Sequence, residues 1–540
     1  MKIAGVWSGH DCSYCVFENG KPIIHNEYER FIREKEPKGD SIKFLIENYE
    51  DYEEIKYLAT ASPLHVVSNH SESWELISKI VEKNGGKIYE IGHHEAHAAN
   101  AFFSSNFNAA TIVTLDGGGV ESDGFVTACT VWKGSDNGIK LVGRIPIHTF
   151  NIGGLWTRAT RYIFKLQSGW PRGHQAGSVM AMSAFGDSSR FLQDFLKMLT
   201  TDIHAASFKP PSQPKGAYIP GGDPTHPYLD PWAKIAENSE KDKFDLAAGL
   251  QAATEIVFRN FLQQALKEAP NSNLCLAGGV TLNSVMTGKI CDWFPEITGM
   301  YVTPTPHDGG LPIGAVQYVW HQVLGNPREK WSDNFTPYLG KTYDKSEIEE
   351  ALVDRSDISW ESVTDDDVLC KLNNQKIVSI FGGGSESGRR ALGNRSILAD
   401  PRNEFMKDII NDKVKHRQWF RPFAPSILVE RAQEWFENSV ESPYMSAVLQ
   451  FKKEKQSFVP AVVHINGSAR LQTVSKNDNE WYHNFLEKWE NISGVPIILN
   501  TSFNDREPIC ETPAHALECF CRTEIDYLYF YDYGILVHKI

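Results

Sequence analysis

Hydrophobic and polar positions follow the same order twice within the first 150 residues. Each block begins with a short apolar run typical of a buried strand and continues with an antiparallel hairpin. We predict these strands at residues 3–8, 12–18 and 21–28, and again at 110–115, 125–132 and 139–145. The pair Asn19-Gly20 supplies the first hairpin with a favoured tight turn. The repetition favours a duplicated fold, although two unrelated hairpins would give the same pattern.

The rest of the chain alternates helices with short strands. Apolar residues at helical spacing predict one long packed helix over 246–269 and another helix over 346–353. We predict strands at residues 274–277, 301–303, 377–381, 445–451, 471–474, 496–499 and 534–538. Residues 324–346 are polar and rich in turn formers, which predicts two domains, 1–335 and 345–540. The expected fold class is therefore α/β.

Composition narrows the classes of function. The chain has 540 residues, of which 41% are hydrophobic and 11% aromatic, as in an ordinary folded protein. Its formal net charge of −14 disfavours nonspecific binding to nucleic acid or to an anionic membrane. No apolar run approaches the roughly 18 residues of a membrane span, and the N-terminus does not resemble a signal peptide. We therefore expect a cytoplasmic protein without nucleic-acid or membrane partners.

Two histidines form the first candidate site. His93 and His97 are four residues apart, so on a helix both imidazoles leave from one face and can bind one metal ion. Asp116 and Asp308 are each expected to end a strand at a glycine turn, from which they could complete the site. This donor set suits Fe(II), Mn(II) or Zn(II) better than magnesium. By itself the histidine spacing is weak evidence, because core or surface histidines show it too.

Glycine-rich segments form the second group of candidates. Gly117 and Gly118 belong to the turn expected after Asp116. Gly278 and Gly279 lie between a predicted strand and Asn283, where a helix is expected to begin. Paired glycines before a helix N-terminus allow close approach of a ribose or a phosphate.

His10 and one further segment have less specific patterns. In the loop 8–13 His10 could act as a general base or donate a hydrogen bond to a reacting carbonyl. A simple turn capped by its own aspartate explains this loop equally well. The segment 173–186, which follows Trp156 and Trp170, suggests a loop beside a ligand, but packing alone would account for it.

Cations concentrate in the C-terminal third of this acidic chain. Arg390 and Arg395 lie in the run 385–396 among Gly, Asn and Ser. Further polar and basic candidates follow at Lys415, Arg417, Arg421, Arg470, Asn500, Ser502 and Asn504. Guanidinium groups match phosphate and carboxylate oxygens, so this pattern favours a site for a nucleotide and a second phosphorylated compound over a solvated basic helix face. The chain contains neither GxxxxGK[ST] nor GxSxG, which argues against a P-loop nucleotide site and an α/β-hydrolase.

Several of these segments resemble the O-carbamoyltransferases typified by the nodulation, cephamycin and tobramycin enzymes. The matching segments keep their order along the chain: GHDCS (9–13), HHEAHAANAF (93–102), LDGGG (115–119), AGGVTLN (277–283), PHDGGLPIGAV (306–316), ESGRRALGNRSILADPR (386–402), FRPFAPSIL (420–428) and LNTSFNDREPICETPAHAL (499–517). Ser178, Ser387 and Arg389 depart from the pattern, because Lys, an aromatic residue and Pro are frequent there.

The resemblance implies two functional parts. An actin-like ATPase domain with duplicated ribonuclease-H-like halves, similar to the tRNA threonylcarbamoyl-transfer enzymes, would precede a YrdC-like α/β domain. The YrdC-like part would make carbamoyl adenylate from carbamoyl phosphate and ATP, which carries Mg. The actin-like part would transfer the carbamoyl group to a hydroxyl of a small-molecule natural product.

The resemblance also implies roles for individual residues. The metal, with Fe(II) favoured and Mn or Zn as alternatives, would be held by His93, His97, Asp116 and Asp308. The catalytic groups would be His10, Arg390, Lys415 and Arg421. The nucleotide and carbamoyl phosphate would be bound by Gly117, Gly118, Gly278, Gly279, Asn283, Arg395, Arg417, Arg470, Asn500, Ser502 and Asn504.

Two other functions stay open from the sequence. The same pair of domains could serve tRNA threonylcarbamoylation, although the acidic charge and the lack of a basic stripe disfavour a tRNA surface. A non-catalytic actin-like nucleotide switch would leave the C-terminal arginines without a role. The acceptor and the metal are left undetermined, as is the oligomeric state, for which a homodimer is the commonest symmetric form.

Overall fold

The computed structural model describes residues 1–68, 72–147, 151–166, 175–199, 229–328, 337–353, 355–438 and 440–540. The chain divides into two compact units, which we describe separately. The first unit comprises Met1–Glu29, Lys35–Met286 and Ile290–Ser332. The second comprises Arg30–Glu34, Thr287–Lys289 and Asp333–Ile540, so two short segments that precede residue 333 belong to it.

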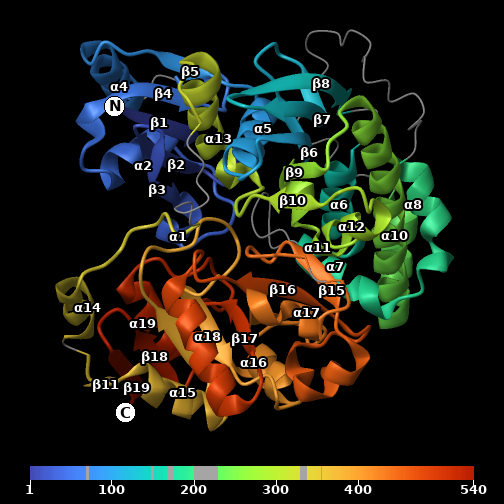
Figure 1. Cartoon of the computed structure of the whole chain (residues 1–540), viewed down its shortest axis with the longest axis vertical. Coiled ribbons are helices and arrows are strands. Elements are labelled where there is room, and N and C mark those ends of the chain that lie inside the picture. Colours follow the sequence, from blue (N-terminus) through green and yellow to red (C-terminus); the bar gives the residue numbers. More distant parts are fainter. Residues whose placement is uncertain are drawn as a thin grey trace. The chain divides into compact units, whose positions relative to one another are not determined.

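Two five-stranded sheets of the same topology frame the first unit (Figure 1). The first has the order β3-β2-β1-β4-β5 and consists of β1 (Lys2–Trp7), β2 (Ser13–Glu18), β3 (Lys21–Glu27), β4 (Ile55–Thr60) and β5 (Ile88–Glu90). The second has the order β8-β7-β6-β9-β10 and consists of β6 (Ala109–Val120), β7 (Val126–Ser135), β8 (Gly138–Pro146), β9 (Asn273–Ala277) and β10 (Gly299–Val302). In each sheet the first three strands are antiparallel and the last two run parallel to the first. This shared order confirms the predicted duplication.

Two helices fill the space between these sheets (Figure 1). Helix α5 (His93–Phe103) packs on β6 and β9, and α13 (Leu311–Gln317) packs on β1 and β2. The two helices touch closely because Gly314 has no side chain: a Cβ there would lie 1.8 Å from the carbonyl oxygen of Ala96. The site residues carried by α5 are therefore held on a rigid layer of the fold.

The remaining helices cover the outer faces of this unit. Helices α2 (Ser41–Asn48) and α4 (Glu72–Lys83) pack on the first sheet. The long helix α10 spans Glu240–Glu268 and begins six residues before its predicted start, because the Ser239 side chain accepts the Asp242 N–H as a cap. Shorter helices in this half of the chain are α1 (Tyr28–Ile32), α3 (Leu64–Val67), α6 (Ile152–Arg158), α7 (Ala176–Met182), α8 (Leu192–Leu199), α9 (Asp230–Asn238), α11 (Ser284–Thr287) and α12 (Ile290–Trp293).

The second unit is built on one mixed sheet of nine strands in the part of the chain that the structure describes. In the order β11-β19-β18-β12-β13-β17-β14-β16-β15 it contains β11 (Ile358–Ser362), β12 (Val378–Phe381), β13 (Arg395–Ala399), β14 (Ala424–Leu428), β15 (Ala447–Gln450), β16 (Ser468–Val474), β17 (Ile497–Ser502), β18 (Tyr527–Phe530) and β19 (Ile535–Lys539). Strands β11, β13, β14 and β18 were not predicted from the sequence. The YrdC-like assignment of this unit stays a prediction.

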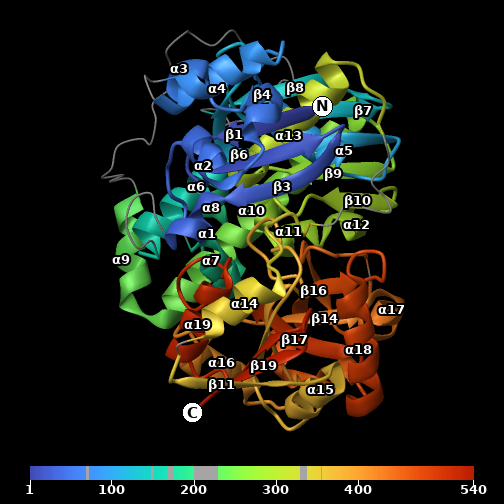
Figure 2. The ribbon, with the colours of Figure 1, turned by 90° about the vertical axis from the view of Figure 1, so that its left-hand side faces the viewer.

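Helices cover both faces of the nine-stranded sheet (Figure 2). One hydrophobic core lies under α14 (Lys345–Leu352), α16 (Met406–Lys413) and α19 (Pro513–Arg522). Buried residues of the short α17 (Ala432–Trp435) belong to the same core. A second core lies under α15 (Asp365–Asn373) and α18 (Glu480–Ser493) on the opposite face. The sheet is therefore buried on both sides, and the loops at its strand ends are free to carry polar side chains.

Two details of the predicted strands are wrong. Strand β6 does not end before Asp116 but continues to Val120, with a shift of register between Leu115 and Gly119. Asp116 consequently lies in a bulge, a feature that re-aims a side chain without ending the strand. Asp308 begins a turn of 3₁₀ helix, Asp308–Gly310, and is separated from β10 by a short loop. None of the described helices combines the length and the apolar character that a membrane span requires.

Candidate functional site

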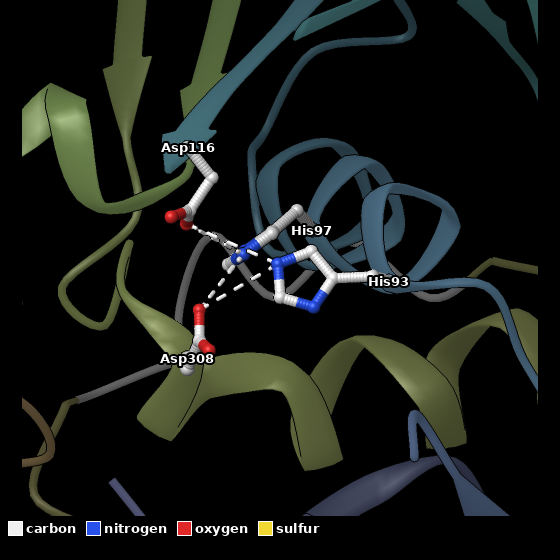
Figure 3. Close-up of side chains that lie close together, drawn as sticks. All are labelled: His93, His97, Asp116 and Asp308. Carbon is white, nitrogen blue, oxygen red and sulfur yellow. Dashed lines mark ion pairs between the residues drawn. The ribbon is translucent and has the colours of Figure 1, made fainter. Parts of the chain in front are cut away.

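Four side chains of the first unit converge beside α5 (Figure 3). His97 Nε2 lies 3.3 Å from an Asp116 oxygen and 3.5 Å from an Asp308 oxygen. His93 Nε2 lies 3.6 Å from the same Asp308 oxygen. One ligand atom of each residue lies within 4.8 Å of those of the other three. The structure thus brings together the four residues that the sequence analysis assigned to a metal.

The start of α5 is held by two acidic side chains. The Gly92 N–H donates to Glu95 at 2.7 Å, and the His94 N–H donates to the buried Glu121 carboxylate at 3.2 Å. Side-chain oxygens at a helix N-terminus satisfy its free N–H groups, and burial raises the pKa of the Glu121 acceptor to about 8. The helix turn therefore begins at His93, and His97 follows on the same face. The sequence analysis did not identify Glu121, whose partner is distant in sequence.

Glycines around Asp116 leave room for the cluster and orient it. The N–H groups of Gly117 and Gly279 donate to the two Asp116 oxygens, the latter at 2.9 Å. A Cβ at Gly119 would lie 2.1 Å from the His93 ring, so only glycine fits where β6 passes this histidine. Gly117 and Gly279 were predicted to contact a nucleotide, whereas in the structure their backbones hold a metal-ligand candidate.

Three further residues of this unit that were predicted to contact a nucleotide, Gly118, Gly278 and Asn283, have local roles in the fold. Gly118 and Gly278 have φ angles of 138° and 93°, which favour glycine. A Cβ at Gly278 would also lie 2.1 Å from the Leu115 carbonyl oxygen. The Asn283 amide donates to the Gln251 side chain at 2.9 Å. Contact of these residues with a nucleotide stays a prediction.

The cluster has the character of a cation site. His93 Nε2 and both ring nitrogens of His97 are buried and have no hydrogen-bond partner. Burial alone would lower the pKa of His97, but the Asp116 and Asp308 carboxylates raise it to about 9. Burial would raise the pKa of Asp116, yet the two imidazoles hold it well below its usual range. Buried imidazole nitrogens without a hydrogen-bond partner, close to two aspartate side chains, fit a divalent ion such as Fe(II), Mn(II) or Zn(II).

Metal affinity is expected to rise with pH between about 6 and about 9. A metal needs the neutral imidazole, and the raised pKa of His97 means that below about pH 9 the ion must displace a proton. Each pH unit below this value should weaken binding by up to about tenfold. Competition of Mn(II) or Zn(II) with a chromophoric chelator at several pH values measures this. An affinity independent of pH would contradict the assignment of His97 as a ligand.

His10 also reaches this cluster. Its Nε2 lies 3.4 Å from an Asp308 oxygen and its Nδ1 lies 3.0 Å from Asp11, while 52% of the side chain is exposed. Partial loss of solvent beside the cluster lowers the pKa of His10, but the charges of Asp308 and Asp11 outweigh it and raise the pKa to about 10. His10 is therefore placed as a hydrogen-bond donor at the edge of the cluster, and its predicted use as a general base is disfavoured while both carboxylates are charged.

A second candidate site in the other unit consists of arginines. Arg390 lies in the loop between β12 and β13, Arg417 and Arg421 in the loop before β14, and Arg470 on β16. Burial and the charges of the neighbouring arginines lower the pKa of Arg390 and of Arg417 well below the usual range. Burial lowers the pKa of Arg421 to about 10, and burial with the Arg421 charge does the same for Arg470.

These four guanidinium groups have no compensating charge. No carboxylate among the described residues forms an ion pair with Arg390, Arg417, Arg421 or Arg470. Like charges brought together in partly buried positions are unfavourable unless an anion joins them. The arrangement therefore fits a ligand that carries several negative charges, such as a phosphorylated compound.

Asn411 shapes the loop that carries two of these arginines. Its side-chain oxygen accepts from Arg417 Nε at 2.7 Å, and its amide donates to the Arg421 carbonyl at 3.0 Å. Asn411 lies on α16 and is 2% exposed. It was missed by the sequence analysis because an isolated asparagine in a helical segment gives no distinctive pattern.

Glu386 shapes the loop that carries Arg390. This fully buried carboxylate accepts the N–H groups of Leu392 and Asn394 at 2.8 Å and that of Arg395 at 3.0 Å. One oxygen thus gathers three backbone donors of the Gly-Asn-Arg turn. Glu386 was also missed, since the sequence analysis examined this run for cations.

Removing the Glu386 carboxylate is expected to destabilise the protein strongly. Glu386→Ala leaves three buried N–H groups without an acceptor, which should lower the free energy of unfolding by at least about 2 kcal/mol. The matched control Glu349→Ala removes an exposed carboxylate that pairs with Lys345 and should change the free energy by less than about 0.5 kcal/mol. Urea unfolding of both variants measures the difference, and equal effects would contradict the role of Glu386.

Arg395 is not brought into the arginine cluster. Its guanidinium donates to the carbonyls of Gly382 at 2.6 Å and Gly383 at 3.2 Å and stacks 3.6 Å above the Phe381 ring. The side chain is completely buried. In the structure the Arg395 side chain therefore holds the loop that begins at Gly382, whereas the sequence analysis expected it to contact a nucleotide.

Lys415 and the residues at the end of β17 bond to one another. Lys415 Nζ donates to the Ser502 carbonyl at 2.8 Å and to the Asn504 carbonyl and side chain at 2.7 and 2.6 Å. The Asn500 amide donates to Gln472 at 2.8 Å, while its side-chain oxygen is buried without a partner. Lys415 therefore lies beside the end of β17, and contact of these residues with a ligand stays a prediction.

The segment 173–186 is only partly described. Trp170 and Gly173 lie outside the described residues. Ser178 is buried on α7, where its hydroxyl donates to Gln175 at 3.3 Å. Trp156 donates from its ring N–H to Thr254 at 2.8 Å. The described part of this segment is thus explained by packing.

Comparison with known proteins gives consistent matches along the chain. The family model described as Carbamoyltransferase N-terminus matches residues 72–317, and the one described as Carbamoyltransferase C-terminus matches residues 370–537. Nodulation protein NolNO of Sinorhizobium fredii is 31% identical over 97% of this chain and 79% of its own length. The 3'-hydroxymethylcephem-O-carbamoyltransferase of Amycolatopsis lactamdurans is 29% identical over 75% of this chain and 74% of its own. Among solved structures, T. kodakarensis HypF covers 60% of this chain and 48% of its own, with 14% identity and a TM-score of 0.35.

Proposed function

The chain belongs to the carbamoyltransferase family, and on this premise we propose that it is an O-carbamoyltransferase that uses carbamoyl phosphate and ATP. Membership of the family makes it a transferase enzyme. The observation that carries the proposal is the cluster of four arginines without counter-charge in a chain whose net charge is −14. Such a cluster supports a substrate pair rich in phosphate.

The first stage would activate the carbamoyl group in the second unit. Water hydrolyses carbamoyl phosphate to carbamate and inorganic phosphate. A carbamate oxygen then attacks the α-phosphorus of ATP, which enters as its magnesium complex, and the bond to the β-phosphate breaks so that pyrophosphate leaves with the electron pair. Arg390, Arg417, Arg421 and Arg470 would neutralise the phosphates and the charge that builds up during this displacement.

The second stage would transfer the carbamoyl group in the first unit. The hydroxyl oxygen of the acceptor attacks the carbonyl carbon of carbamoyl adenylate. The bond between this carbon and the AMP oxygen breaks, and the hydroxyl proton passes to the departing phosphate. His10, kept protonated by the negative charges of Asp308 and Asp11, would donate a hydrogen bond to the developing oxyanion.

A divalent ion would be held by His93, His97, Asp116 and Asp308. When bound, it would supply Lewis-acid stabilisation of the negative charge on the carbonyl oxygen. We favour Fe(II), with Mn(II) or Zn(II) as alternatives for the same donor set. The acceptor would be a hydroxylated small-molecule natural product, as the name of the related 3'-hydroxymethylcephem-O-carbamoyltransferase suggests.

Detection of carbamoyl adenylate tests the proposal. The purified protein is incubated with labelled carbamoyl phosphate and ATP, and the nucleotides are separated by chromatography. Carbamoyl adenylate, pyrophosphate and phosphate are expected in equal amounts. Absence of the labelled nucleotide from a protein that binds both substrates would overturn the proposal.

A further inference from the structure

One segment of the second unit comes from the beginning of the chain. Arg30–Glu34 belongs to this unit, although the residues on either side belong to the first. The Arg30 side chain is 3% exposed and donates from Nη2 to the Gly388 carbonyl at 2.6 Å. Its Nη1 lies 3.6 Å from a Glu511 oxygen. One guanidinium thus joins the loop before β13 to the chain segment that follows β17.

The partner carboxylate of Arg30 is fully engaged. Glu511 is 1% exposed and accepts the Ser385 hydroxyl at 2.7 Å and 2.9 Å on its two oxygens. Gly340 packs against this network, and only glycine fits there, because a Cβ would lie 1.8 Å from the Ser385 hydroxyl oxygen. A buried ion pair of this kind is costly to break, since removal of one partner leaves the other charge uncompensated.

Arg33 attaches the same segment at a second place. Its guanidinium donates to the carbonyls of Pro508 at 2.7 Å and Ile509 at 2.8 Å and lies 3.6 Å from Glu507. The segment therefore contacts residues 507–511 through both arginines, and Arg30 also contacts the loop 385–390 through the Gly388 carbonyl. The two arginines can be tested separately.

We propose that Arg30 is a positioning residue of the carbamoyl-adenylate site, an inference that rests on the proposed function. Gly388 has a φ of 93° and no side chain, so hydrogen bonds to its backbone decide where this part of the loop lies. Arg390 follows two residues later and belongs to the arginine cluster. The planar guanidinium of Arg30 holds a carbonyl and a carboxylate at fixed angles, which a lysine ammonium cannot reproduce. The adenylate-forming site thus depends on a residue from the first tenth of the chain.

Arg30→Lys in the full-length protein tests this role. Lysine keeps the charge opposite Glu511 but loses the fork that reaches Gly388. We expect the KM for carbamoyl phosphate in carbamoyl-adenylate formation to rise by about 10- to 100-fold, because small displacements of binding groups cost this much, together with a lower Tm, since the Gly388 carbonyl loses a buried donor. In Arg30→Ala, millimolar guanidinium should restore part of the rate.

Arg402→Lys is the matched control. Arg402 also lies in the second unit and also joins a buried carboxylate, Asp400, to a carbonyl, that of Ser493 at 2.8 Å. This variant should lower Tm without changing the KM for carbamoyl phosphate. Rates are measured well below each Tm and divided by the folded fraction from circular dichroism.

The outcomes separate the two proposals. If the wild-type protein forms no carbamoyl adenylate, the proposed function fails. If the wild-type protein is active and Arg30→Lys keeps the wild-type KM, the positioning role is overturned. The same holds if Arg30→Ala loses activity only in proportion to its folded fraction and guanidinium does not restore the rate.

Discussion

Asp308→Asn is expected to remove the bound metal and abolish carbamoyl transfer while carbamoyl-adenylate formation continues near the wild-type rate. Asparagine has the size of aspartate but lacks the charge that faces His93, His97 and His10. With one carboxylate left, the cluster should lose affinity for a divalent ion by at least about 100-fold. Mutating a residue that only hydrogen-bonds to a metal ligand costs about 10- to 100-fold in affinity, and loss of a ligand itself should cost more. The residues of the second unit that would activate carbamoyl phosphate are untouched.

Three measurements check this result. Elemental analysis gives the metal content, release of labelled pyrophosphate gives adenylate formation, and release of AMP with an accepted hydroxyl compound gives transfer. The matched control Asp123→Asn removes an exposed carboxylate of the same unit that pairs with Arg144 at 2.7 Å, and it should keep its metal. Wild-type metal content in Asp308→Asn would show that these four residues do not form the metal site.

Arg470→Met is expected to change stability and activity in opposite directions. In the ligand-free protein Arg470 lies among like charges, and burial with the Arg421 charge lowers its pKa to about 10. Methionine has a similar length and no charge, so its introduction should relieve this repulsion and raise Tm. The same change should slow carbamoyl-adenylate formation by at least about 100-fold, as for the loss of a donor that stabilises developing charge.

Thermal unfolding with and without ATP and carbamoyl phosphate checks this second result. The wild-type protein should gain stability from the anions, and Arg470→Met should gain much less. The control Arg431→Met removes an exposed arginine that pairs with Glu434 and Glu490, so it should not raise Tm and should leave the rate unchanged. A lower Tm for Arg470→Met, with full activity, would show that its charge is compensated in the protein and serves no anion.

Local patterns were sufficient for the two repeated blocks of the first unit, although β4 and β5 were not predicted. Each strand of these blocks alternates or buries its residues over a few positions, and it pairs with the strand that follows it in the chain. The pair His93 and His97 needed only helical spacing, which is set by backbone geometry within five residues. These features depend on contacts close in sequence, so they could be predicted.

Strands β13 and β14 show where such patterns fail. Both are central in the nine-stranded sheet and buried on both faces, so neither alternates in polarity. The sequence analysis read the residues around them as loops that carry cations. Arg395 was consequently predicted to contact a nucleotide. In the structure it is the first residue of β13, and its guanidinium donates hydrogen bonds to backbone carbonyls.

The sequence by itself determined the two repeated three-stranded blocks, the histidine pair and the presence of a concentrated group of cations in an acidic chain. Only the tertiary structure decided that Asp116 and Asp308 meet that pair, that Arg390, Arg417, Arg421 and Arg470 gather without Arg395, and that Arg30 belongs to the second unit. The physical reason is range. Periodicity and spacing record interactions within one turn or one strand, whereas burial and charge pairing between distant segments depend on which surfaces meet when the whole chain folds.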